Sequence, residues 1–274
     1  MRPRRSALYV PGSNARALAK AASLDADVLI FDLEDAVLPE AKIEARAAIA
    51  AVVGTGWQEK IVRVNGLDTP WGAADLAWAA TLPIDGVLLP KVDDPTPVRQ
   101  AERAVPCAIW CMVETPRGVI GLDAIARDSD RLAVLVMGTS DLVKSLRARH
   151  VADRAPVAYA LGRAVMVARA YGLDVLDGVH LAIDDDAGFR ASSEASRGLG
   201  FDGRTLIHPR TIAEANRVYG ASAEEVAHAE RVIAAFAVAE QRGQGVAVLD
   251  GALIERLHVE EAERIIATHR ATTR

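Results

Sequence analysis

The sequence predicts an α/β protein, a (β/α)8 TIM barrel with a C-terminal helical extension. Eight short apolar runs bounded by turn residues alternate with helix-like segments along most of the chain. The length of 274 residues fits one such barrel followed by a tail. No stretch suggests an antiparallel hairpin. An open doubly wound sheet is disfavoured because the turn at Gly12 lacks the G-x-G-x-x-G spacing.

The elements follow in a regular order. Strands are expected at residues 7–10, 28–33, 61–64, 86–89, 108–113, 132–137, 175–179 and 205–207. Helices are expected between them at 14–23, 40–53, 75–80, 97–104, 119–127, 155–171 and 186–198. Then come a long helix at 223–241, a glycine-rich turn at 243–251 and a last helix at 262–269. We expect a catalytic barrel domain over residues 1–220, and a helical extension over 221–274 that serves as a lid or an oligomer arm.

Composition narrows the classes of partner. Hydrophobic residues make up 51% of the chain and aromatic residues only 4%, which predicts a large aliphatic core. The net charge of −5 argues against nucleic acid as the main partner. No apolar run approaches the roughly 20 residues of a membrane span. The basic N-terminus lacks the apolar core of a signal peptide, so we expect a cytoplasmic protein.

Ionisable residues stand at most of the predicted strand ends. In a barrel of this class the active site is built at the carboxyl ends of the strands. These ends carry Glu34, Asp35, Arg63, Lys91, Glu114, Asp141, Asp177 and His208. A ring of polar groups on an apolar barrel therefore predicts a catalytic centre there.

Glu114 and Asp141 follow two neighbouring predicted strands. Two carboxylates at the same edge of a parallel sheet suit a hard divalent cation, which prefers oxygen ligands and leaves positions open for a substrate. The alternative is a pair of solvated loop carboxylates. The two cysteines are too few for a structural zinc site.

Three strand-end residues allow more than one role. Arg63 interrupts an apolar run, where a charge needs a partner: either a substrate carboxylate or a structural ion pair with Glu34 or Asp35. Lys91 is either a loop charge or a contact to a phosphate or an enolate. A Schiff base at Lys91 is disfavoured by the paired carboxylates. His208 either anchors its loop or acts in catalysis.

Seven motifs together resemble one family. They are YVPGS at 9–13, DLEDAV at 32–37, RVNGLDTPWG at 63–72, LPK at 89–91, ETPRG at 114–118, GTSDL at 138–142 and LGFDGRTLIHP at 199–209. In this order they resemble the citrate lyase beta-subunit-like proteins of the HpcH/HpaI aldolase group, with the malyl-CoA and citramalyl-CoA lyases. The resemblance implies a (β/α)8 barrel, a Mg²⁺ cofactor, C–C cleavage or condensation of acyl-CoA thioesters, and a homo-oligomer, with a trimer suggested.

The resemblance also implies roles for individual residues. The metal carboxylates map onto Glu114 and Asp141, and the arginine that binds the substrate carboxylate maps onto Arg63. In the mechanism that we expect on this basis, the backbone of Gly138, Thr139 and Ser140 completes the clamp around a 2-oxoacid, and Glu34 and Asp35 orient water on the metal. The CoA contacts map onto Tyr9, Lys20, Ile207 and His208. Asn14 stands where some relatives carry an arginine, which weakens one CoA contact.

The tail departs from the family pattern. Relatives end in a D-G-R-[ML]-[VI]-D segment, whose last aspartate acts as an acid or base in a neighbouring subunit's site. Here Ala252 replaces the arginine and Glu255 replaces that aspartate. Glu255 keeps the carboxylate but adds a methylene, and a displacement near 1 Å can lower the rate about a hundredfold. Because the carboxylate stands at the family position, in a tail that the barrel does not require, we expect Glu255 to be catalytic and carried on a lid.

These observations lead to an expected function. The leading expectation is a Mg²⁺-dependent lyase that splits a 3-hydroxyacyl-CoA such as malyl-CoA or citramalyl-CoA into an acyl-CoA and a 2-oxoacid. The alternatives are a malyl-CoA thioesterase, and a citrate lyase beta subunit that works with acyl carrier partner subunits.

Overall fold

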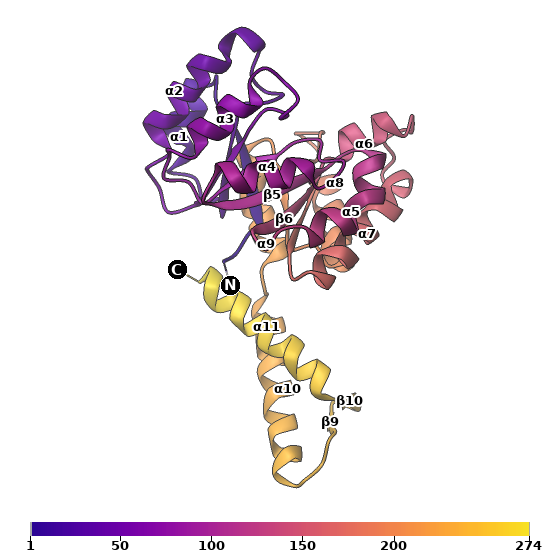
Figure 1. Cartoon of the computed structure of the whole chain (residues 1–274). Coiled ribbons are helices and arrows are strands. Elements are labelled where there is room, and N and C mark those ends of the chain that lie inside the picture. The colour runs from indigo at the N-terminus through magenta and orange to yellow at the C-terminus, as the bar shows by residue number, and fades with distance from the viewer. Residues whose placement is uncertain (1, 274) are drawn as a thin grey trace. The chain divides into compact units, whose positions relative to one another are not determined.

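The computed structural model describes residues 2–273 and contains a closed barrel of eight parallel strands, shown in Figure 1. The strands are β1 (Ser6–Pro11), β2 (Val28–Asp32), β3 (Glu59–Arg63), β4 (Gly86–Leu89), β5 (Ala108–Val113), β6 (Leu132–Met137), β7 (Asp174–Asp177) and β8 (Gly203–Leu206). Each strand pairs with the next in the chain, and β8 closes on β1. This confirms the predicted (β/α)8 architecture, and a helical C-terminal segment follows it.

Helices follow the strands and cover the outside of the barrel (Figure 1). They are α1 (Ala15–Ala21), α2 (Lys42–Val52), α3 (Gly72–Ala79), α4 (Thr96–Ala104), α5 (Pro116–Arg127), α6 (Thr139–Ser145), α7 (Ala158–Ala170), α8 (Asp186–Leu199) and α9 (Ile212–Tyr219). Short 3₁₀ turns lie at Pro39–Ala41, Ala155–Val157 and Pro209–Thr211. The chain divides into two compact units: residues 4–215 form one, and residues 2–3 with residues 216–273 form the other.

The barrel interior changes from apolar to polar along the strands. Ile30, Ile61 and Trp110 are fully buried in one core cluster. Because side chains alternate between the two faces of a strand, the residues two positions further on occupy the same inner face. On β2 and β3 these are Asp32 and Arg63. The candidate site therefore lies directly next to the apolar core, on the inner face of the same strands.

Ion pairs hold the opposite, amino-terminal end of the barrel. Arg4 Nε lies 2.8 Å from Glu59 Oε2, and Arg4 also pairs with Asp174. Arg5 Nε lies 2.8 Å from Asp27 Oδ2. These charges are remote from the carboxyl ends of the strands, so they stabilise the barrel rather than serve the site.

Two sequence-based expectations were wrong in detail. No helix was expected between residues 127 and 155, but α6 begins at Thr139, with only one residue between it and the end of β6. No hairpin was expected, yet β9 (Ala247–Leu249) and β10 (Ala252–Ile254) pair antiparallel. The connecting residues Asp250 and Gly251 have φ values of 52° and 82°. An Asp-Gly dipeptide in this left-handed conformation is typical of a β-hairpin turn, so the sequence at 250–251 could have predicted the hairpin.

The second unit has its own small core. Its long helices α10 (Ala223–Gln241) and α11 (Arg256–Thr272) pack against each other (Figure 1). Phe236, Ile254 and Val259 are buried between them. The last helix was expected only over 262–269, but it begins at Arg256, where Glu255 is the N-cap residue. Whether this unit serves as a lid stays a prediction.

Within residues 2–273, no helix has both the length and the apolar character that crossing a membrane requires.

Trp110 tests the packing of the barrel core, because it is the largest side chain that is fully buried. We expect Trp110→Ala to lower the free energy of unfolding by about 3–5 kcal/mol, because it leaves a large cavity. Trp110→Phe is the matched control and should cost less, since most of the volume is kept. Urea unfolding followed by circular dichroism measures both, and equal stability of the Ala variant and the wild type would contradict this packing.

Candidate active site at the carboxyl end of the barrel

An ion pair between β2 and β3 forms the floor of the site. Asp32 and Arg63 are direct neighbours in the strand register. Arg63 donates from Nε to Asp32 Oδ1 (2.7 Å) and from Nη2 to Asp32 Oδ2 (2.6 Å). Asp32 is 1% exposed and Arg63 is 7% exposed. The planar guanidinium is therefore held in one orientation by a bidentate pair.

Asp32 also fixes the loop after β2. Its carboxylate accepts hydrogen bonds from the backbone N–H of Glu34 (2.8 Å) and of Ala36 (3.2 Å). From α2, the buried Lys42 donates Nζ to the carbonyls of Leu33 (2.8 Å) and Glu34 (3.0 Å). The loop that carries the acidic pair is thus held by side chains on both sides.

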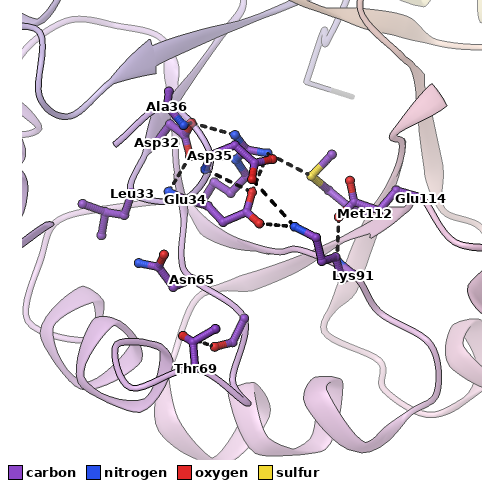
Figure 2. Close-up of polar contacts among 12 residues, drawn as sticks. Asp32, Leu33, Glu34, Asp35, Ala36, Asn65, Thr69, Lys91, Met112 and Glu114 are labelled. Atoms are coloured by element: carbon purple, nitrogen blue, oxygen red, sulfur yellow. Dashed lines mark hydrogen bonds and ion pairs between the residues drawn. The ribbon is translucent and has the colours of Figure 1, made fainter. Parts of the chain in front are cut away.

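Glu34 lies between the cations Arg63 and Lys91, and Figure 2 shows its contact with Lys91. Its Oε2 is 3.0 Å from Arg63 Nη1, and its Oε1 forms an ion pair with Lys91 Nζ. Asp35 is more exposed, with Oδ2 at 3.6 Å from Arg63 Nη1. Burial raises the pKa of the Glu34 carboxyl. The structural ion pair expected for Arg63 exists, but Asp32 is its main partner, and the sequence analysis missed that residue.

Glu114 is oriented by its neighbours on both sides. It is 1% exposed and follows β5. Its Oε1 accepts a hydrogen bond from the backbone N–H of Lys91 at 2.7 Å. Its Oε2 lies against Gly138, where an added Cβ would come within 2.5 Å. Only glycine at 138 leaves room for this carboxylate. Burial raises the pKa of Glu114 to about 7.

The start of α6 brings further polar groups to the same place. Gly138 N–H donates to Val113 O (3.0 Å), so this N–H is used within the barrel, and the expected substrate contacts of the 138–140 backbone stay predictions. The N–H groups of Thr139, Ser140 and Asp141 precede the first bond of the helix, which Leu142 donates to Gly138 O (3.1 Å). Among the residues described, the buried Ser140 Oγ has no hydrogen-bond partner.

A cavity of about 440 Å³ joins these groups. Its lining combines polar residues from several strand ends with an apolar wall: Tyr9, Pro11, Asp32, Asp35, Ala36, Arg63, Met112, Glu114, Met137, Gly138, Thr139, Ser140, Asp141, Val179, Thr205 and Ile207. Tyr9 and Met112 form part of the floor. Tyr9 Oη and Arg63 Nη1 each lie 3.7 Å from Met112 Sδ, and Arg63 Cζ lies 4.8 Å from the centre of the Tyr9 ring.

The other predicted residues lie elsewhere. Lys20 is exposed on α1 and is not among the lining residues of the cavity. His208 lines a much smaller cavity next to it, and its Nδ1 accepts from Arg210 N–H (3.2 Å) at the start of a 3₁₀ turn. Asp177 is fully buried and pairs with both Nη atoms of Arg154 at 2.6 Å. Asp177 is therefore structural.

The donor set of the cavity suits a hard cation. Glu114 and Asp141 offer carboxylate oxygens, and the orphaned Ser140 Oγ adds a hydroxyl. In residues 2–273, no three His, Cys, Asp or Glu side chains gather closely enough to enclose a metal ion. A cation held here by two carboxylates keeps positions for water and substrate, as a catalytic site requires.

Comparisons with known proteins identify the family of the chain. Residues 5–209 match the family model of the HpcH/HpaI aldolase/citrate lyase family, so the chain belongs to that family. It is 46% identical over 269 residues to (3S)-malyl-CoA thioesterase of Cereibacter sphaeroides, which covers 97% of this chain and 94% of the relative. It is 32% identical over 301 residues to the L-malyl-CoA/beta-methylmalyl-CoA lyase of the same organism, with the same two coverages.

A solved structure is similar over the whole chain. It is the protein CitE from Mycobacterium tuberculosis in complex with magnesium, acetoacetate and coenzyme A. The TM-score is 0.82 at 29% identity, and the match covers 97% of each chain. The family is thus one of enzymes whose named members include lyases and thioesterases, and the resemblance drawn from the sequence motifs is confirmed.

Glu114 gives the metal-free protein a distinctive pH dependence. Because its pKa is raised from 4.5 to about 7, the folded state keeps a proton that the unfolded state releases in this window. The free energy of unfolding therefore falls as pH rises from about 4.5 to about 7, by on the order of 3 kcal/mol from this group. Glu114→Gln cannot ionise and should lack this contribution.

Urea unfolding of both proteins in EDTA, at intervals between about pH 4 and about pH 8, measures the difference. The wild type should become progressively less stable than Glu114→Gln as pH rises. Parallel curves for the two proteins would show that burial does not raise this pKa.

Proposed function

We propose that the protein is a Mg²⁺-dependent thioesterase for a short 3-hydroxyacyl-CoA whose acyl end carries a carboxylate, as malyl-CoA does. The supporting observation is the cavity in which Glu114 and Asp141 share the lining with Arg63, in a chain 46% identical to a (3S)-malyl-CoA thioesterase. The second candidate is C–C cleavage to an acyl-CoA and a 2-oxoacid, the reaction first expected from the sequence. The 32% identity to a malyl-CoA lyase favours that candidate.

Each polar group then has a role. Glu114 Oε2 and the Asp141 carboxylate would hold Mg²⁺, which when bound polarises substrate oxygens. Arg63 lines the cavity and binds the acyl carboxylate through Nη1, because its other two nitrogens are already held by Asp32. The N–H groups of Thr139 and Ser140, at the start of α6, stabilise the negative charge that develops on the substrate.

The remaining residues handle water and CoA. Glu34 and Asp35 orient water at the mouth of the site. In hydrolysis a water oxygen bonds to the acyl carbon, the C–S bond breaks, and the leaving thiolate takes a proton to give CoA and the free acid. Tyr9 and Ile207 line the cavity and are proposed to contact CoA. Lys20 and His208 lie outside it, and their CoA contacts stay predictions.

Product analysis tests the proposed function. The purified chain, with Mg²⁺ and malyl-CoA, should release malate and CoA, identified by mass spectrometry. Acetyl-CoA and glyoxylate as the main products would establish the lyase instead. Turnover only after adding acyl carrier partner subunits would favour a citrate-lyase-type subunit.

The metal carboxylates give a first prediction. Glu114→Gln and Asp141→Asn should each weaken Mg²⁺ binding by at least about tenfold, because each removes a charged oxygen ligand. Calorimetry measures the affinity and circular dichroism checks the fold. Glu44→Gln, an exposed change on α2, is the matched control and should bind Mg²⁺ as the wild type does. Unchanged affinity in either site variant would remove that residue from the metal site.

The arginine gives a second prediction. Arg63→Lys keeps the charge but cannot make both hydrogen bonds to Asp32 and still present a donor to the cavity. We expect kcat/KM to fall at least about tenfold, roughly 1.4 kcal/mol of transition-state binding. Arg99→Lys, which alters an exposed pair with Asp128, should leave kcat/KM unchanged. If Arg63→Lys has wild-type kinetics, Arg63 is only structural.

The tail carboxylate gives a third prediction. Glu255 is exposed at the start of α11, and its backbone N–H donates to His258 Nδ1 (3.0 Å). If Glu255 activates water in a neighbouring subunit's site, Glu255→Ala should abolish turnover and spare Mg²⁺ binding. Mixing the Glu255→Ala and Arg63→Ala proteins should then restore partial activity. Full turnover by Glu255→Ala alone would show that the tail is not catalytic.

A further inference from the structure

Lys91 has an unusual backbone conformation for a lysine. It follows β4 with φ at +50°, in the left-handed region that favours glycine. Glycine would adopt this conformation without steric cost. A residue held in a disfavoured conformation beside a candidate site indicates that its side chain has a task there.

Lys91 contacts two site residues through different groups. Its backbone N–H donates to Glu114 Oε1 at 2.7 Å. Its ammonium pairs with Glu34 Oε1 and lies 3.8 Å from Asp35 Oδ1. Figure 2 shows these contacts, with Lys91 between the loop after β2 and Glu114. One residue from β4 thus connects carboxylates that follow β2 and β5.

The ion pair of Lys91 with Glu34 affects how Arg63 can bind a substrate. Glu34 Oε2 lies 3.0 Å from Arg63 Nη1, while Lys91 holds the other oxygen. Nη1 also lies 3.6 Å from Asp35 Oδ2, and its remaining hydrogen bond goes to the thioether of Met112 at 3.7 Å. A thioether is a weak acceptor, so a carboxylate in the cavity readily replaces it.

We propose that Lys91 is a positioning residue for substrate binding: its ammonium holds one oxygen of Glu34 away from Arg63 and thereby keeps Arg63 Nη1 open to the carboxylate of the substrate. The proposal rests on the proposed function, because it assigns Arg63 to that carboxylate. Without the ammonium, Arg63 is the only cation within ion-pair distance of the nearly buried Glu34 carboxylate, since Lys42 donates to the Glu34 backbone carbonyl, and both carboxylate oxygens turn to the guanidinium.

The net charge of the site also makes Lys91 favourable for substrate binding. The site contains the carboxylates of Asp32, Glu34, Asp35, Glu114 and Asp141, against the cations Arg63, Lys91 and Lys42. Removing the lysine charge makes the site more repulsive to an anionic acyl group while leaving the oxygen ligands of the metal in place. The effect should therefore fall on substrate binding rather than on Mg²⁺.

Three variants distinguish the effect of the Lys91 charge from the effect of its backbone conformation. Lys91→Met removes the charge at similar length, Lys91→Gly also relieves the positive φ, and Lys91→Arg keeps the charge. All three keep the backbone N–H that donates a hydrogen bond to Glu114. Lys60→Met is the control, since Lys60 lies near the amino-terminal end of β3 and its Nζ donates to Gly56 O (3.1 Å). It changes the net charge equally, far from the site.

The measurements are KM and kcat with malyl-CoA and Mg²⁺, and calorimetric titration of pyruvate and of Mg²⁺. We expect Lys91→Met and Lys91→Gly to raise KM and the pyruvate Kd by at least about tenfold. Their kcat and Mg²⁺ affinity should stay within about threefold of the wild type. Lys91→Arg and Lys60→Met should keep KM within about threefold. Lys91→Gly should also keep the wild-type Tm, because glycine tolerates φ of +50°.

Two results would overturn the proposal. One is a wild-type KM and pyruvate Kd in Lys91→Met. The other is a joint loss of kcat, Mg²⁺ affinity and Tm in that variant, which would make Lys91 merely structural. If the wild type binds pyruvate but does not hydrolyse malyl-CoA, the proposed function fails while the pyruvate titration still decides the role of Lys91. If the wild type does neither, both fail.

Discussion

The bidentate pair of Asp32 and Arg63 is the interaction on which the candidate site depends. It joins adjacent strands at register neighbours and is nearly excluded from water. Breaking a buried pair by removing one partner costs about 3–5 kcal/mol, because a charge is left without compensation. Asp32 uses its remaining acceptor capacity on the backbone of the loop after β2. One carboxylate thus orients the arginine and the acidic loop together.

Glu114, at the same end of the barrel, is also held in one orientation by its neighbours. Glu114 is held by a backbone N–H from β4's loop on one side and by the absence of a side chain at Gly138 on the other. Its Oε2 is thereby turned toward the start of α6, where Asp141 lies in the first helical turn. Burial makes the charged form of Glu114 costly, and a bound cation would remove that cost. The metal-free site is therefore poised to take up positive charge.

Local sequence patterns predicted the barrel because each strand is a short apolar run and each carboxyl end is marked by a charge. They placed Arg63, Glu114 and Asp141 on one cavity, as the structure confirms. They missed Asp32 because it lies inside the strand expected at 28–33 rather than after it, and its bond to Arg63 depends on the register of β2 and β3. They missed α6 because Gly138, Thr139 and Ser140 have turn-like composition. Asp177 looked like a site residue because its partner Arg154 lies in a separate loop.

Anomalous diffraction from crystals soaked with Mn²⁺ and malate tests the central claim most directly, because Mn²⁺ takes the same hard oxygen ligands as Mg²⁺. The claim is that one cavity binds a divalent cation through Glu114 and Asp141 and a carboxylate through Arg63. We predict an anomalous peak bonded to Glu114 Oε2 and to the Asp141 carboxylate, with a malate carboxylate oxygen on Arg63 Nη1 in place of Met112 Sδ. A Mn²⁺ peak on other residues, or malate bound away from Arg63, would contradict it.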